Sequence, residues 1–96
     1  MSLTESQCKH LRGLGHHLKP LVLVGSDGLS VNVVAEINSS LDHHELIKVR
    51  VRSSGRKERD ELIAELASRS FAQLIQRIGN VALIYRASEK PTIVIP

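Results

Sequence analysis

The sequence is poor in aromatic residues and in cysteine. Among its 96 residues, Phe71 and Tyr85 are the only aromatics of the Phe, Trp and Tyr class, and Cys8 is the only cysteine. One cysteine excludes an internal disulfide and a cysteine-based zinc site, and it favours a cytoplasmic location. Domains that recognise single-stranded bases usually stack them on aromatic side chains, and two aromatics cannot build that platform. Nucleic-acid binding by this chain would therefore have to rest on phosphates and shape.

Long hydrophobic runs are absent as well. No stretch approaches the ~18 apolar residues of a membrane span. Residues 1–6 lack the basic segment, followed by an apolar one, that is typical of a secretory signal. We therefore expect no membrane partner. The content of 42% hydrophobic and 24% charged residues is typical of a soluble globular protein, and the length predicts one domain over residues 1–96.

The periodicity of apolar residues predicts the order α-β-α-β-α-β-β, with a short extra helix before the last two strands. Helices are expected from about residue 5 to 18, over 31–41, over 56–69 and, as the short one, over 71–78; strands are expected over 21–24, 45–52, 81–86 and 92–95. The last two strands are close in sequence and should pair as an antiparallel hairpin. This order predicts an α/β fold of the α+β type, a two-layer sandwich with three main helices and a mixed four-stranded sheet.

Three of these elements carry more specific expectations. In the first helix, leucines at i, i+3 and i+7 predict a buried stripe of Leu11, Leu14 and Leu18. The strand over residues 21–24 is apolar on both faces, which favours a central position in the sheet. Residues 31–41 fit two structures, because alternating β-branched residues favour a strand, whereas their length and a Ser30 cap favour a helix. We adopt the helix.

A Gly-x-x-Gly sequence, Gly25-Ser26-Asp27-Gly28, lies between the first strand and the next helix. Glycines at such a junction can let backbone N–H groups face an anion. The motif alone is weak, since most such tetrapeptides are ordinary turns. Asp27 would also repel a phosphate. If the loop meets an anionic ligand, we therefore expect it to position that ligand while cations nearby attract it.

Basic residues are concentrated more than the net charge of +3 indicates. In the strand over residues 45–52, apolar side chains alternate with Lys48, Arg50 and Arg52, which should share one face. Such a face is usually just solvated, but three cations without an intervening acid favour an anionic partner. Lys9, Arg12 and His16 share one face of the first helix. The cations Arg56, Lys57 and Arg59 open the third helix, where they form either i,i+4 pairs with Asp60 and Glu61 or a second basic patch.

Catalytic and metal-binding patterns are missing. The pairs His16-His17 and His43-His44 consist of adjacent residues, which do not share a face of a helix or strand. Cys8 and His10 are two apart and diverge on a helix. We therefore predict no catalytic residues, no metal and no cofactor.

Several segments together resemble a known family. They are Leu11-Arg12, the segment 17–20 with the glycine loop, His44-Glu45-Leu46-Ile47-Lys48-Val49, Ile78-Gly79-Asn80-Val81, Tyr85-Arg86 and Ile95-Pro96. In this order they resemble the CRM domain, named for chloroplast RNA splicing and ribosome maturation, in its stand-alone bacterial YhbY form. Loops of the family commonly hold a basic residue between the glycines, where this chain has Ser26-Asp27.

The resemblance implies a non-enzymatic RNA-binding protein associated with precursors of the large ribosomal subunit, with a fold like the C-terminal domain of translation initiation factor three. It also implies a glycine loop comparable to that of KH domains. The candidate RNA-binding residues are Lys9, Arg12, His16, Lys19, Gly25, Ser26, Asp27, Gly28, Lys48, Arg50, Arg52, Arg56, Lys57 and Arg59. We expect the first-helix cations to approach the glycine loop. The partner would be ribosomal RNA, and the protein a monomer.

An alternative function requires no phosphate contacts. The same basic surface fits a protein-interaction module that docks on an acidic protein partner. Nuclease treatment separates the two hypotheses, because association through RNA is lost when the RNA is removed.

Overall fold

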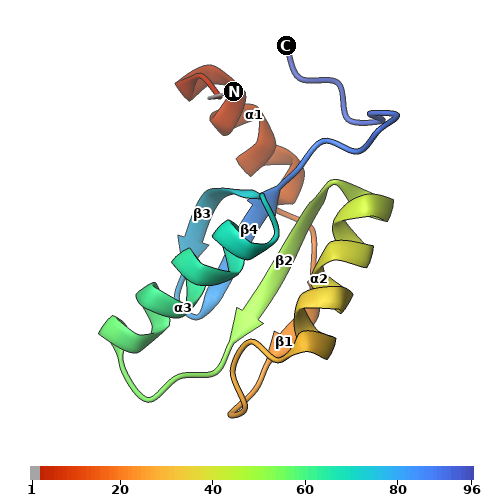
Figure 1. The fold of residues 1–96 in the computed structure, drawn as a ribbon. Helices are drawn as coiled ribbons and strands as arrows, with labels where there is room; N and C mark the ends of the chain where they lie inside the picture. Colours follow the sequence, from red (N-terminus) through yellow and green to blue (C-terminus); the bar gives the residue numbers. More distant parts are fainter. Residues whose placement is uncertain (1–2) are drawn as a thin grey trace.

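The computed structural model of the protein describes residues 3–96. Figure 1 shows its elements, which are α1 (Glu5–Gly15), β1 (Pro20–Val24), α2 (Val31–His44), β2 (Leu46–Val51), α3 (Arg56–Arg69), β3 (Gln73–Ile78) and β4 (Val81–Tyr85). The order α-β-α-β-α-β-β and the mixed four-stranded sheet confirm the predicted fold class. No helix within residues 3–96 has the length and apolar character needed to cross a bilayer.

The strands lie in the order β1-β2-β4-β3. β1 runs parallel to β2, and β4 is antiparallel to both β2 and β3. The predicted central position of the first strand is therefore wrong, because β1 is an edge strand. Val22 and Val24 are buried, but Leu21 and Leu23 on the opposite face are 52% and 57% exposed. The apolar residues on both faces of β1 therefore belong to an edge strand that has one buried and one exposed face.

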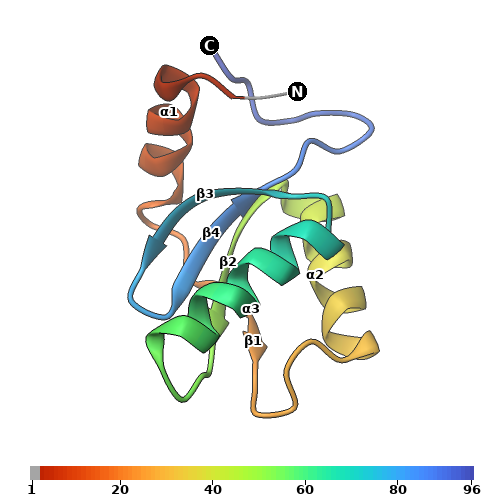
Figure 2. The ribbon, with the colours of Figure 1, turned by 60° about the vertical axis from the view of Figure 1, so that its left-hand side comes forward.

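The helices are divided between the two faces of the sheet, as Figure 2 shows. α2 and α3 cover one face, and with it they enclose the main core of Val22, Val24, Ile37, Leu41, Ile47, Val49, Val51, Ile63, Leu66, Ala82 and Ile84. α1 packs on the other face at one end, where Leu11 joins Leu46, Ile75, Leu83 and Tyr85. Ile93 and Ile95 of the tail also pack against this cluster. We call the part of the second face that neither α1 nor the tail covers the open face of the sheet.

The contact of α1 with the sheet differs from the predicted leucine stripe. Leu11 is fully buried, whereas Leu14 and Leu18 are 44% and 38% exposed. α1 ends at Gly15, and a Cβ at that position would lie 2.6 Å from a Leu83 methyl group. Leu11 and Gly15 are four residues apart, so one turn brings both to the sheet. The helix thus packs through one leucine and one glycine, and the predicted stripe is confirmed for Leu11 but wrong for Leu14 and Leu18.

The helix prediction for residues 31–41 is confirmed, and α2 continues to His44. The Ser30 hydroxyl oxygen accepts a hydrogen bond from the Val33 N–H at 3.2 Å. This cap satisfies a donor that the first turn of a helix leaves unpaired. The alternating β-branched residues were therefore outweighed by the cap and by burial of Ile37 and Leu41.

The predicted short helix over residues 71–78 is wrong, because this segment contains β3. α3 ends at Arg69 with Ser70 as its C-cap, and Phe71 then adopts a φ of 56°, which stops the helix. Gly79, also at a φ of 56°, forms a two-residue hairpin turn with Asn80, so Ile78 pairs with Val81. A register shift between residues 74 and 76 hides the alternation that would have predicted a strand. The antiparallel hairpin is thus β3–β4, one strand earlier than predicted.

The predicted last strand, residues 92–95, is also wrong, since the tail is held by a buried carboxylate. Glu45 is 1% exposed, and it accepts hydrogen bonds from the N–H groups of Ser88, Thr92 and Ile93 and from the Thr92 hydroxyl, at 2.8–2.9 Å. Burial raises the pKa of Glu45, but these hydrogen bonds outweigh burial and bring the pKa to about 2. Hydrogen bonds to the Glu45 side chain, together with packing of Ile93 and Ile95 against the second core, therefore hold the tail, and it does not pair with the sheet as a strand.

Candidate nucleic-acid interface

The glycine loop between β1 and α2 is closed by its own hydrogen bonds. The Gly28 N–H donates to the Gly25 carbonyl oxygen at 3.0 Å, and the Ser30 N–H donates to the Gly28 carbonyl oxygen at 3.1 Å. Gly28 has a φ of 70°, a region that favours glycine. The loop is thus a formed turn, and its last glycine N–H is already used within it.

The two glycines of the loop have different reasons to be glycine. Gly28 needs its positive φ, although a Cβ there would meet nothing within 4 Å. Gly25 has neither a positive φ nor any atom within 4 Å of the position of a Cβ. Neither strain nor packing within residues 3–96 therefore requires glycine at position 25. A bare backbone on an exposed turn allows close approach of another molecule.

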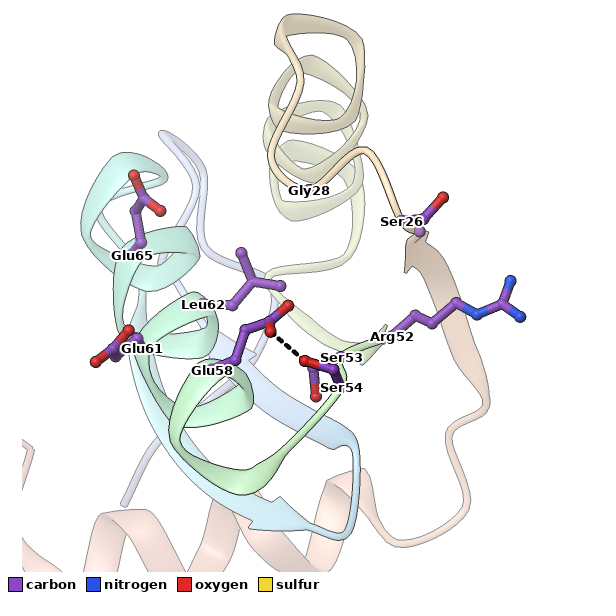
Figure 3. A pocket seen from close by; sticks show the side chains of 10 residues that line it. Ser26, Gly28, Arg52, Ser53, Ser54, Glu58, Glu61, Leu62 and Glu65 are labelled. Atoms are coloured by element: carbon purple, nitrogen blue, oxygen red, sulfur yellow. Dashed lines mark hydrogen bonds between the residues drawn. The ribbon is translucent and has the colours of Figure 1, made fainter.

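A cleft of about 530 Å³ lies between the glycine loop and α3. Figure 3 shows that its α3 side carries three glutamates, Glu58, Glu61 and Glu65, whereas Arg52 points away from them. The Ser54 hydroxyl donates to Glu58 at 2.5 Å, and Arg69 forms an ion pair with Glu65 at 2.9 Å. We call this hollow the acidic cleft. Like charges repel, so it disfavours a phosphate on this side of the loop.

Lys48 and Arg50 of β2 lie on the open face of the sheet, and Arg52 follows directly after β2 at the edge of the acidic cleft. Apolar Ile47, Val49 and Val51 are buried beneath α2 and α3, which confirms the predicted alternation. Lys48 is adjacent to Leu83 of β4, and Arg50 is adjacent to Val81. Among residues 3–96, no carboxylate oxygen lies within 4.0 Å of a side-chain nitrogen of Lys48, Arg50 or Arg52. We call Lys48, Arg50 and Arg52 the β2 strip, and its positive charge is uncompensated.

The cations of α1 do not approach the glycine loop as predicted. Figure 2 shows α1 at one end of the sheet and the turn after β1 at the other. Lys9 and His16 are exposed, and Arg12 pairs with Glu5 at 3.1 Å. Lys19 immediately precedes β1, whose first residue is opposite Lys48. Lys19 therefore adjoins the beginning of the β2 strip, and Arg52 adjoins the glycine loop at its end.

The cations that open α3 are split. Arg59 is 13% exposed and pairs with Asp60 at 3.1 Å, and Arg77 of β3 reaches the same carboxylate at 3.8 Å. Arg56 and Lys57 are exposed. Within the described residues, the i,i+4 alternative is not found, because neither Arg56–Asp60 nor Lys57–Glu61 forms an ion pair at 4.0 Å or less. The three cations thus do not form one patch.

Two features of the site were not predicted. The first is the acidic cleft, which could have been found from glutamates at 58, 61 and 65, an i, i+3, i+7 stripe on one helix face. The second is an aliphatic groove on the open face, between the end of α1 and the β3–β4 hairpin. It could not be found, because it depends on the unexpected strand β3. Within residues 3–96, no cluster of three or more His, Cys, Asp or Glu side chains could hold a metal ion.

Comparison with known proteins identifies the family. The model of the CRS1/YhbY (CRM) domain matches residues 3–86, which span all seven elements. The chain belongs to the CRM domain family. The resemblance carried by the glycine loop and the segment 44–49 is thereby confirmed.

Proteins similar to this chain include several from bacteria. A Pseudomonas aeruginosa protein named "probable RNA-binding protein" is 44% identical, with 95% of this chain and 88% of that protein covered. A Haemophilus influenzae protein named "RNA-binding protein" is 40% identical, covering 99% and 96%. The solution structure of a Staphylococcus aureus protein has a TM-score of 0.84 at 33% identity, covering 99% of this chain and all of that one. The fold is thus shared along almost the whole length.

Proposed function

We propose that this CRM protein is a non-catalytic, monomeric, cytoplasmic RNA-binding protein that binds ribosomal RNA in precursors of the large subunit. The names of the Pseudomonas and Haemophilus relatives support RNA binding, and the family resemblance supports the ribosomal target. The single observation that carries the proposal is the uncompensated strip of Lys48, Arg50 and Arg52. Cations without internal partners are available for phosphate oxygens.

The geometry supports a path for the RNA backbone. Lys48 lies towards the α1 end of β2, and Arg52 adjoins the glycine loop. Four residues of strand span about 13 Å, which is enough for two phosphates of one strand. Glutamates line the other side of the loop. We therefore expect the backbone to follow the open face of β2 and to meet the loop from that side, with Gly25 allowing close approach.

Salt dependence tests the proposal. A structured fragment of large-subunit ribosomal RNA should bind with an affinity that falls steeply with salt, because bound cations release condensed counterions. Replacing Lys48 and Arg50 by Gln should lower the slope of log affinity against log salt by about 1 to 2. An affinity that does not change between low and moderate salt would contradict the proposal.

A second candidate function is docking on an acidic protein partner. It is favoured by a largely apolar groove of about 400 Å³ at the other end of the open face, where Leu14, Leu18 and Leu21 lie beside Lys19 and His44. Apolar surface beside a lysine fits a segment that carries both apolar and acidic residues. Co-purification with large-subunit precursors that survives complete RNA removal would support this candidate over RNA binding.

A further inference from the structure

The open face of the sheet carries a groove whose lining differs from a simple phosphate site. It has a volume of about 260 Å³ and extends across all four strands, from Leu18 and Pro20 through β2 and β4 to β3. Its aliphatic members include Ile78 and Leu18, which are 65% and 38% exposed. Ile78 lies opposite Val81, so the two side chains are neighbours on one face. The groove thus has an aliphatic floor that residues 3–96 leave uncovered.

Polar side chains border this aliphatic floor. Lys48 and Arg50 line the groove from β2, and the Gln76 side chain lines it from β3. Lys48 and Gln76 both lie beside Leu83, one on each side of β4. An amide offers donors and an acceptor to a planar polar ligand, and a guanidinium can stack on a ring face. The groove carries no carboxylate. Its chemistry suits a flat, partly apolar ligand that is linked to a negatively charged group.

We propose that this groove holds an unpaired RNA base, and this inference rests on the proposed RNA-binding function. The face of the base would lie on Ile78 and Leu18, its polar edge would be near Gln76, and its phosphates would contact Lys48 and Arg50. These two cations belong to the phosphate strip already proposed, so the groove continues that surface. Aliphatic contacts replace the aromatic platform that the sequence lacks.

The proposal specifies which RNA this face binds. Bases inside a duplex are stacked and paired, and only loops, bulges and ends present a free base at low cost. A fully paired duplex of equal charge could still contact Lys48 and Arg50, but it could not fill the groove. The protein should therefore prefer RNA that contains a loop or bulge, and the preference should depend on the aliphatic floor.

The test compares two RNAs of equal phosphate number, a hairpin with an unpaired loop and a fully paired duplex, with Ile78→Thr as the variant. Threonine keeps the β-branched shape at a position that is mostly exposed, so the fold should tolerate it. Leu74→Thr is the matched control, because Leu74 lies on the same strand but opposite Ile84 of the covered face. Binding constants and salt slopes are measured for each protein with each RNA, after circular dichroism has confirmed folding.

The expected result is that Ile78→Thr binds the hairpin about fivefold more weakly, while its duplex affinity and its salt slope do not change. Leu74→Thr should match the unmodified protein. Equal affinity of the unmodified protein for both RNAs, or an Ile78→Thr variant that binds the hairpin normally or loses both RNAs equally, would overturn the base site while the RNA-binding function stands. If the unmodified protein binds neither RNA, the proposed function itself fails.

Discussion

The two hollows beside β2 have opposite character. The acidic cleft has Glu58, Glu61 and Glu65 on its α3 side. The groove on the open face has Lys48 and Arg50 above an aliphatic floor and no carboxylate. The glycine loop borders the first hollow, and Arg52 points out of it (Figure 3). A glycine loop alone would not determine from which side an anionic ligand approaches. The charge difference between the two hollows does determine it.

Reversing one charge on the open face is expected to have the largest effect. Arg50→Glu should weaken binding to a structured ribosomal RNA fragment at least about tenfold, because one phosphate contact becomes a repulsion. Lys90→Glu, the same charge change on the exposed tail, is the control and should have little effect. Equal losses in the two variants, measured by filter binding or fluorescence anisotropy, would mean that only net charge matters and would remove the distinction between the hollows.

A change in the loop between the hollows comes next. Gly28→Val forces a β-branched residue to a φ of 70°, although its side chain would enter open space. We expect RNA affinity to fall about fivefold and the free energy of unfolding by roughly 1–3 kcal/mol. Gly28→Asn should lose less of both, since asparagine tolerates this region. If folded Gly28→Val binds RNA normally, the loop is an ordinary turn.

Neutralising the acidic cleft should have a smaller effect of the opposite sign. In the triple variant Glu58→Gln, Glu61→Gln, Glu65→Gln, RNA affinity should rise about threefold, because only screened repulsion across the loop is removed. The comparison variant, Glu36→Gln on α2, should change little. A fall in affinity in the triple variant would indicate that the glutamates contact the RNA, and the acidic cleft would then be part of the binding site.

The buried carboxylate Glu45 is expected to have no effect on RNA affinity at neutral pH, but it controls stability in acid. Its folded pKa of about 2 is below the ordinary value of 4.5. The stabilisation is therefore complete above about pH 5 and is lost as pH falls towards 2. Glu45→Gln should be less stable than the unmodified protein at pH 7 and should lose less on acidification. Thermal unfolding at a series of pH values checks this, and parallel pH curves would contradict it.

The order of elements could largely be predicted, because local signals determine it. The Ser30 cap, the alternation along β2 and the glycine loop all lie within a few residues of the features they specify. The fold class and the cationic face of β2 were correct for this reason. The same local signals identified the family through the segments around residues 25–28 and 44–49.

Features that depend on distant contacts were not predictable. Residues 73–78 form a strand because Phe71 ends α3 and β4 offers a partner, and neither is visible in the apolar pattern of the segment. The tail is fixed by Glu45, which is more than 40 residues away. The separation of the α1 cations from the glycine loop likewise follows from the direction of β1. The candidate list therefore stays a prediction, and the sequence could not specify which of its residues share a surface.

The most direct test of the central claim is an NMR titration of the labelled protein with a hairpin from large-subunit ribosomal RNA. The claim is that RNA lies on the open face and not in the acidic cleft. We expect the backbone amides of Lys48, Arg50, Ile78 and Val81 to shift, together with those of the glycine loop, while those of Glu58, Glu61 and Glu65 stay unchanged. Shifts concentrated in α3 with an unperturbed β2 and β3–β4 hairpin would contradict it.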